Sequence, residues 1–253
     1  MTKPGEGTSV PGPPLPFRAM AVAKRVLPSS VYYRYLGRHE RGSLSVWRRL
    51  VDRAPVDSSI LDVGAYHGLY ALAARERRSD VEVVAFEPNQ EALATLRAAC
   101  AGRSIATEGL AVAAVTGSVS FSLDGESSGI VAADHEGDGV QLAAVSLDDW
   151  TDAHGADPWL LKVDVEGGED GVLTGGRRVM ARARPIVLCE VLDDEAGRRV
   201  QRALPEGYRY FRIDEDRGLR HEQTIERRAW RHKNHLLVPA EHASMVQDAV
   251  AGG

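Results

Sequence analysis

The sequence predicts an α/β protein in which helices flank a mostly parallel sheet of seven strands. Five short apolar segments have the length and composition of buried strands: residues 60–63, 81–86, 105–112, 159–164 and 185–191. Segments with helical periodicity follow three of them, at residues 69–77, 89–100 and 168–182. Strands that alternate with helices at this spacing indicate βαβ units and a parallel sheet. Two further apolar segments are expected to close the sheet as an antiparallel pair, at residues 208–213 and 235–238.

Composition divides the chain into four parts. Residues 1–16 are rich in Pro, Gly, Ser and Thr, which predicts a disordered leader. Residues 17–58 are expected to form a helical extension, residues 59–240 the α/β domain, and residues 241–253 a C-terminal tail.

The middle of the domain departs from the α/β alternation. Residues 118–122 and 140–145 alternate apolar and polar side chains with period two, and a Gly-, Ser- and Asp-rich segment at 124–139 separates them. We expect a β-hairpin-like insertion with a loop close to the functional site.

Bulk properties exclude several classes of protein. A net charge of -5 is no basis for binding long nucleic acid, where phosphate contacts supply much of the affinity. No apolar run approaches the roughly 20 residues that span a membrane, and the N-terminus lacks the apolar region of a signal peptide. The two cysteines, Cys100 and Cys189, have no paired spacing, so we expect neither a disulfide framework nor a zinc site, and a cytoplasmic protein. These properties do not indicate an oligomeric state.

A glycine loop follows the first strand. Dinucleotide-binding loops have the pattern G-x-G-x-x-G, which lets bare backbone approach a pyrophosphate. Here Gly64 and Gly68 enclose Ala65, Tyr66 and His67, so bulky side chains stand where a second glycine belongs. Asp62 precedes the turn and would repel a pyrophosphate, whereas it suits the ammonium and sulfonium of S-adenosylmethionine (SAM). The loop therefore favours SAM over NAD.

Glu87 ends the second strand, just before Pro88. An acid about 20 residues after a glycine loop can accept two hydrogen bonds from the hydroxyls of a ribose. The alternative is an acid that stabilises the N-terminus of the following helix. We favour the ribose contact because of this interval.

Five segments in order resemble the FkbM family of SAM-dependent methyltransferases: ILDVGAYHGLYALAA, VVAFEPNQEALATL, VSLDDW, LLKVDVEGGEDGVLTGG and PIVLCEV. The similarity runs over residues 60–191, with a weaker match at NHLLVP. It implies a Rossmann-like class I methyltransferase fold and an enzyme that methylates hydroxyls of natural products or sugars. It also implies the residues that bind SAM: Asp62, Gly64, Ala65, Tyr66, Gly68, Tyr70, Glu87, Pro88, Leu110, Ala111 and Asp164.

Within this set, the resemblance assigns the amino-acid end of SAM to Asp62, Gly64 and Gly68, and the adenine to the region of Leu110 and Ala111. The family usually has Asn where this chain has Tyr66. Tyr66 is therefore expected to contact the methionine carboxylate either through its hydroxyl or through its backbone.

The fourth strand carries the residues that we expect to act in catalysis. Lys162 and Asp164 lie on the same strand face, where a buried lysine requires a partner, at the end of the sheet where α/β folds bind ligands. Asp164 could orient the acceptor hydroxyl, act as a base, or bind a divalent cation with Glu190. Glu166 and Glu169 follow, and each fits either the site or a helix cap.

Histidines supply further candidate bases: His67, His135 and His235. Of these, His67 lies inside the cofactor loop. A charged segment at residues 217–233, which includes Arg220, fits either an anionic substrate or a solvated face.

Four functions remain open, and the leading one is an O-methyltransferase that acts on a small molecule. The others are an N-methyltransferase that acts on an amine or guanidine, an NAD-linked oxidoreductase, and a SAM-binding module without activity.

Overall fold

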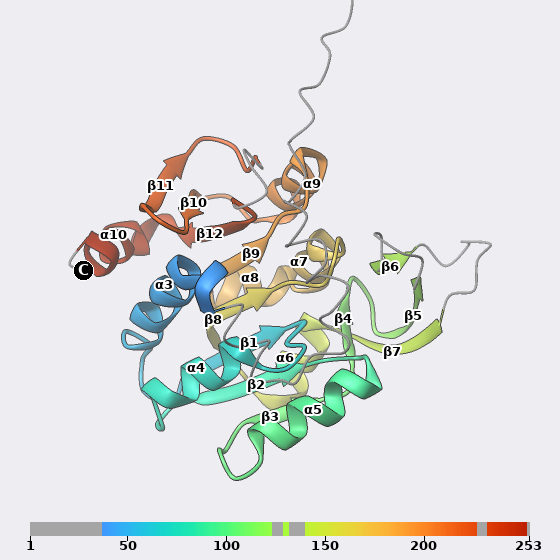
Figure 1. Ribbon diagram of the computed structural model, residues 1–253. Helices are drawn as coiled ribbons and strands as arrows, with labels where there is room; N and C mark the ends of the chain where they lie inside the picture. The colour runs from blue at the N-terminus through green and yellow to red at the C-terminus, as the bar shows by residue number, and fades with distance from the viewer. Residues whose placement is uncertain (1–36, 123–128, 132–139, 227–231, 252–253) are drawn as a thin grey trace, which may run out of the picture.

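The structure, a computed structural model, describes residues 37–122, 129–131, 140–226 and 232–251. Among them, eight strands form one sheet in the order β11-β10-β12-β9-β8-β1-β2-β3 (Figure 1). Their bounds are β1 Ser59–Val63, β2 Glu82–Phe86, β3 Ala106–Glu108, β8 Pro158–Val163, β9 Ile186–Glu190, β10 Tyr208–Asp214, β11 Gly218–Glu222 and β12 Asn234–Pro239. The five strands from β9 to β3 are parallel to one another.

The predicted antiparallel closure is confirmed, because β12 pairs antiparallel with both β9 and β10. The predicted seven strands are present in a mostly parallel sheet. β11 adds an eighth at the edge, where it folds back on β10.

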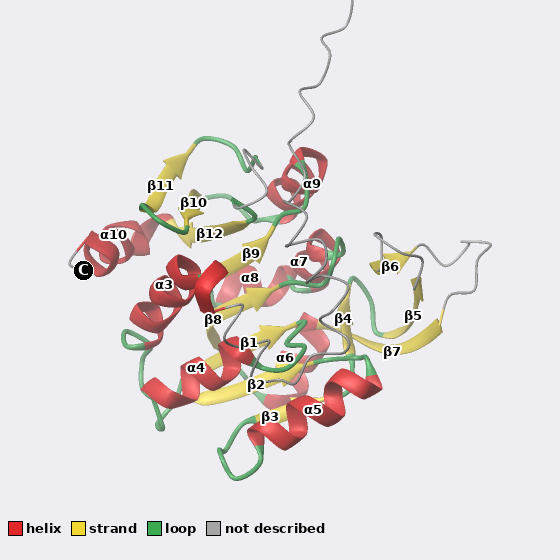
Figure 2. Cartoon of the chain, viewed as in Figure 1, coloured by secondary structure: helices red, strands yellow, loops and turns green. Residues whose placement is uncertain are grey.

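Helices cover both faces of this sheet (Figure 2). On one face α3 (Arg41–Val51), α4 (Leu69–Arg77), α5 (Gln90–Cys100) and α10 (Ala243–Ala251) contribute to a core with Ile60, Val83 and Leu160. On the other face α6 (Leu147–His154), α7 (Glu169–Gly175), α8 (Arg177–Arg182) and α9 (Asp194–Ala203) pack with Leu61, Val84 and Leu161. Successive strand residues point to opposite faces, and both sets are apolar, as in parallel sheets buried on both sides.

A second sheet of four strands has the order β4-β7-β5-β6, with β4 Ala111–Ala113, β5 Gly117–Ser122, β6 Gly129–Val131 and β7 Val140–Ser146. The antiparallel pairing of β5 with β7 confirms the predicted hairpin. Most of the loop expected at residues 124–139 lies outside the described residues.

Two predicted elements are each divided in two. The strand expected at residues 105–112 was wrong as a single element, since β3 belongs to the large sheet and β4 to the small one. The helix expected at residues 168–182 is α7 followed by α8. At Gly175 a Cβ atom would lie 2.1 Å from the carbonyl oxygen of Ala113, so α7 ends in close contact with β4.

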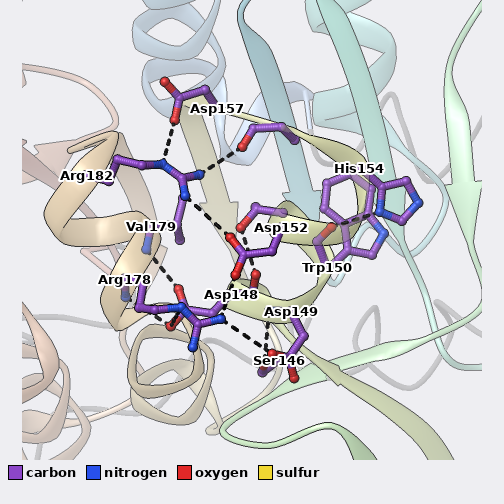
Figure 3. A network of polar contacts seen from close by, with 12 residues as sticks. Ser146, Asp148, Asp149, Trp150, Asp152, His154, Asp157, Arg178, Val179 and Arg182 are labelled. Carbon is purple, nitrogen blue, oxygen red and sulfur yellow. Dashed lines mark hydrogen bonds and ion pairs between the residues drawn. The ribbon is translucent and has the colours of Figure 1, made fainter.

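Polar contacts hold α8 against α6 (Figure 3). The buried carboxylate of Asp148 accepts hydrogen bonds from the backbone N–H groups of Arg178 at 3.0 Å and Val179 at 2.8 Å. Arg178 and Arg182 then reach Asp152 at the surface. Asp148 thus satisfies the first N–H groups of α8, as a capping side chain does.

The structure describes only parts of the predicted terminal segments. The predicted leader and residues 17–36 of the predicted extension lie outside the described residues. In the C-terminal tail, residues 243–251 form α10, and the buried Val246 joins the core beside α3. Arg49 of α3 donates to the carbonyl of Ala249 at 2.9 Å. Every helix among the described residues is too short or too polar to span a membrane.

Candidate active site at the carboxyl edge of the sheet

Four adjacent parallel strands each place an acid at the carboxyl edge of the sheet. In spatial order these are Glu190 at the end of β9, Asp164 directly after β8, Asp62 in β1 and Glu87 directly after β2. This edge is where open α/β sheets bind ligands. The sequence therefore brings its candidate residues together here.

The glycine loop fits closely against β8. Gly64 has a φ of +77°, and a Cβ atom there would lie 1.8 Å from the carbonyl oxygen of Asp164. The N–H groups of Gly64 and Ala65 donate to the carbonyl of Phe86 at 3.1 and 2.9 Å. Gly68, at a φ of +85°, is the N-cap residue directly before α4. The first glycine is thus required by contact between protein segments as well as by the turn.

Asp62 points to the start of α4. Its Oδ2 accepts a hydrogen bond from the backbone N–H of Ala71 at 2.9 Å, and the residue is 2% exposed. Burial raises the pKa of Asp62 to about 6, against the opposing effect of the Lys162 ammonium. The ionised form of Asp62 is therefore short of partners, and a ligand cation would stabilise it.

Glu87 is held by backbone groups on both of its carboxylate oxygens. Oε2 accepts from the N–H of Tyr66 at 2.8 Å, and Oε1 accepts from the N–H of Asn89 at 2.9 Å. Burial raises its pKa, and these two hydrogen bonds oppose the shift. Each oxygen keeps further acceptor capacity, so the carboxylate is oriented and still able to receive two hydroxyl groups.

Tyr66 contributes to this arrangement through its backbone. Its φ of +49° is left-handed, a conformation that turns its N–H toward Glu87. Its ring stacks on His67, with ring centroids 3.9 Å apart. The contact of Tyr66 with the methionine carboxylate, through its hydroxyl or its backbone, stays a prediction.

The region expected at the adenine lies beside Glu87. The Glu87 N–H donates to the carbonyl of Glu108 at 2.9 Å, which aligns the segment that continues into Leu110 and Ala111. Ala111 is buried at the start of β4, while Leu110 and Pro88 are half-buried.

Lys162 and Asp164 form the expected pair. The Lys162 Nζ lies 2.9 Å from Asp164 Oδ2, and the side chains are 2% and 26% exposed. Burial disfavours the charge of Lys162, but the carboxylates of Asp164 and Asp62 outweigh it and raise its pKa. Burial likewise disfavours the charge of Asp164, but Lys162 and a hydrogen bond with Glu190 hold the pKa of Asp164 far below its usual range. Asp164 is thus an ionised carboxylate that remains accessible.

Three further residues complete this side of the site. The Lys233 Nζ lies 2.5 Å from Glu190 Oε1 and 3.1 Å from Glu40 Oε1. The hydroxyl of Tyr70 donates to Glu40 Oε2 at 2.8 Å. Burial and the neighbouring Asp164 raise the pKa of Glu190 well above its usual value.

Glu40 and Lys233 did not emerge as site residues from the sequence, although Lys233 ends the charged segment noted there. The scarcity of lysine in the sequence could have pointed to Lys233. The chain has 31 basic residues, and only Lys3, Lys24, Lys162 and Lys233 are lysine. The two that fall within the described residues both lie in this site.

The structure does not support the alternative in which Asp164 and Glu190 bind a divalent cation. Lysine ammonium groups lie against both carboxylates. Within the described part of the chain, no group of three or more His, Cys, Asp or Glu side chains is arranged to hold a metal ion.

The acids after β8 have different surroundings. Glu169 is buried, and its Oε1 accepts from the N–H groups of Val165 at 3.1 Å and Gly167 at 3.0 Å, in the turn before α7. Because these donors precede the helix, the cap and the site both stay predictions for Glu169. Glu166 is exposed at a left-handed φ of +57°, close enough to Glu190 for its charge to raise the pKa of that carboxyl.

Two of the three candidate histidines lie within the described residues. The His67 ring stacks on Tyr66. Burial lowers the pKa of His67, and the charge of Glu91 in α5 opposes this shift. Helix α5 packs beside β3, the edge strand of the large sheet. His235 is fully buried, with its ring nitrogens 3.3 and 3.1 Å from the carbonyls of Lys233 and Glu226. Burial lowers the pKa of His235 to about 4, which indicates a neutral structural residue. His135 lies outside the described residues.

Comparisons with known proteins identify the family of the chain. Residues 62–218 match the model of the Methyltransferase FkbM domain. Among solved structures, the methyltransferase FkbM from Methylobacillus flagellatus KT is 18% identical, with a TM-score of 0.47 over 72% of this chain and 43% of that one. The chain thus spans less than half the length of that protein. Precorrin-6y C5,15-methyltransferase from Geobacter metallireducens GS-15 is 13% identical, with a TM-score of 0.44 over 78% of this chain and 84% of that one. No curated protein matches the chain.

Proposed function

Because the chain belongs to the FkbM methyltransferase family, we propose that it transfers the methyl group of SAM to a hydroxyl of a small-molecule acceptor. The observation that supports this most is the ionised, accessible Asp164, held by Lys162 at the same sheet edge as the cofactor loop. A small acceptor, rather than nucleic acid or a membrane, accords with the net charge of -5.

The residues at this edge fit SAM better than a dinucleotide. Glu87 would receive the ribose hydroxyls, since both of its oxygens are oriented by backbone donors and keep acceptor capacity. Asp62 would receive the amino group, which supplies the positive charge that its buried carboxylate lacks. Leu110 and Ala111 would flank the adenine. When bound, SAM supplies an electrophilic methyl group.

Asp164 positions the acceptor. A hydroxyl that donates a hydrogen bond to this carboxylate is aligned at the edge of the sheet beside the cofactor loop. Well-oriented reactants gain roughly 7–11 kcal/mol from such placement. Lys162 keeps Asp164 ionised and fixed, because its ammonium lies 2.9 Å from one carboxylate oxygen.

The pair formed by Asp164 and Glu190 handles the proton. The pair acts in its fully ionised form: as the acceptor oxygen takes the methyl group, its proton passes to Asp164 and is then shared with Glu190, whose raised pKa makes it the better proton acceptor of the two. A positioned base of this kind contributes about 10²–10⁴-fold. Both carboxyl groups titrate as a unit, so the pH dependence belongs to the pair.

The proposal is tested with SAM that carries a radioactive methyl group and two matched panels of acceptors. One panel holds alcohols, phenols and sugars, and the other holds the corresponding amines and guanidines. We expect label to move to members of the hydroxyl panel, and Asp164→Asn to lose that transfer.

Label found only in amine products would replace this proposal with N-methylation. Binding of S-adenosylhomocysteine without any product in either panel would indicate a module without activity. In both cases the assignment of hydroxyl methylation is overturned.

A further inference from the structure

Six side chains close a ring on the acceptor side of the site: Glu40, Tyr70, Lys162, Asp164, Glu190 and Lys233. Each contacts the next in space. Lys162 binds Asp164, Asp164 shares a hydrogen bond with Glu190, and Glu190 binds Lys233. Lys233 binds Glu40, Glu40 accepts from the Tyr70 hydroxyl, and the Lys162 ammonium lies 5.0 Å from the centre of the Tyr70 ring.

The ring joins distant parts of the chain. Glu40 precedes α3, Tyr70 lies in α4, Asp164 follows β8, and Lys233 precedes β12. No local sequence pattern requires these contacts, and burial of several charges is costly unless each is paired. Each charged member here has an oppositely charged partner, and Lys233 serves two carboxylates at once.

Glu40 is itself firmly placed. Two and three residues further on, Gly42 and Ser43 donate backbone N–H groups to the Glu215 carboxylate at 2.7 and 3.0 Å, and the Ser43 hydroxyl donates to the same group. Asn234, next to Lys233, donates to the Ser43 hydroxyl at 2.9 Å. The start of α3 and the start of β12 are therefore tied together beside the ring.

Lysine suits its two positions in the ring. A lysine ammonium is a compact charge with three donors, whereas a guanidinium is a planar fork. Lys233 donates toward two separate carboxylates, Glu190 and Glu40, at 2.5 and 3.1 Å. In a chain that otherwise uses arginine, both described lysines serve this ring.

We propose that Glu40 and Lys233 are positioning residues, which hold Glu190 against Asp164 so that the carboxyl pair can take up the proton of the acceptor. This inference rests on the proposed function. When the pair is fully ionised, three carboxylates face two ammonium groups. Uptake of one proton, released as the acceptor oxygen forms its bond to the methyl group, gives a ring with no net charge.

The pH at which the Asp164 and Glu190 carboxyls are both ionised depends on all charges around them. Lys233 opposes the burial and the Asp164 charge that raise the pKa of Glu190. Removal of Lys233 therefore raises that pKa further. Glu166 also raises the pKa of Glu190, and Lys162 lowers that of Asp164. The charge of Asp164 in turn raises the pKa of five surrounding groups: Asp62, Tyr70, Glu87, Glu169 and Cys189. Glu40 faces the pair through the Lys233 ammonium, 3.1 Å away.

Three variants test the proposal. Lys233→Met removes the ammonium, and Glu40→Gln removes its second carboxylate but keeps an acceptor for Tyr70. The double variant removes one charge of each sign, so it remains available if Lys233→Met alone fails to fold. Arg209→Met, at an exposed position of β10, is the control for loss of a basic residue.

The first measurement needs no cofactor. The carboxyl signal of Glu190 is followed by ¹³C NMR over pH in ligand-free protein and identified by its loss in Glu190→Gln. We expect its midpoint to move to higher pH in Lys233→Met and to stay unchanged in Arg209→Met. An unchanged midpoint in Lys233→Met, or in the double variant if the single one does not fold, overturns the proposal.

The second measurement uses the acceptor found with the hydroxyl panel. We expect kcat to fall about 10²-fold in Lys233→Met, with its acid limb moved to higher pH, since misplacement by about 1 Å has an effect of this size. Affinity for S-adenosylhomocysteine should change less than twofold. Wild-type kcat and pH profile in every variant would overturn the inference and leave the proposed function intact. Failure of the wild-type protein to methylate any acceptor would instead overturn the proposed function, while the NMR result stands by itself.

Discussion

Replacement of Asp62 by Asn is expected to stabilise the fold while it weakens cofactor binding. Asp62 is 2% exposed, and burial raises its pKa from 3.8 to about 6. A shift of one pKa unit corresponds to about 1.36 kcal/mol, so the ionised carboxylate costs about 3 kcal/mol in the folded state at pH 7. Asparagine carries no charge and keeps an oxygen for the Ala71 N–H.

The sign of the pH dependence follows from proton binding. Below pH 3.8 Asp62 is protonated in both states, and it imposes no cost. Between that pH and about 6 the unfolded state binds fewer protons, so wild-type stability falls as pH rises. Above about 6 the cost is constant. The advantage of Asp62→Asn should therefore be about 3 kcal/mol at pH 7 and under about 1 kcal/mol at pH 4.

Urea unfolding followed by circular dichroism from pH 4 to pH 7 measures this difference. Asp248→Asn, an exposed carboxylate of α10, is the control and should show no comparable trend. The reasoning is refuted if Asp62→Asn is less stable than wild type at pH 7, or if its advantage does not change with pH.

Three further predictions concern the site. Glu87→Gln should weaken S-adenosylhomocysteine binding by about 2 kcal/mol, or roughly 30-fold, because neutral hydrogen bonds replace charge-assisted ones; calorimetry that shows wild-type affinity would disprove the ribose contact. Asp164→Asn should lower methyl transfer by about 10²-fold or more with little change in cofactor affinity, and wild-type turnover in the labelled-methyl assay would contradict its role. Gly64→Ala should destabilise the fold by about 3 kcal/mol or more, since the new Cβ would clash with the Asp164 carbonyl. The control Gly102→Ala has a similar φ but open space around the Cβ, so it should destabilise the fold by only about 1 kcal/mol. Equal losses of stability on urea unfolding would refute the contact argument.

The central part of the fold was predictable because its strands are apolar on both faces. Segments such as β1 and β9 are buried at every position, so length and composition alone identified them. The strand at residues 105–112 could not be divided correctly, because the break depends on which sheet receives each half. Likewise the end of α7 depends on the contact of Gly175 with β4, which lies about 60 residues earlier in the chain.

The acids at the strand ends were predictable for a related reason. A parallel strand that ends in Asp164 or Glu87 places that residue at the carboxyl edge wherever the strand lies in the sheet. Glu40 and Lys233 were not, because their positions depend on pairing between segments that lie more than 190 residues apart. Asp62 was predicted as a site residue, but its hydrogen bond with the start of α4 was not, because it depends on how the loop between them folds.

Calorimetric titration of the wild-type protein with S-adenosylhomocysteine and, separately, with NAD tests the central claim most directly. The acids at the sheet edge and the loop without a second glycine predict saturable binding of S-adenosylhomocysteine and none of NAD. Binding of NAD with no binding of S-adenosylhomocysteine would contradict the account of the site.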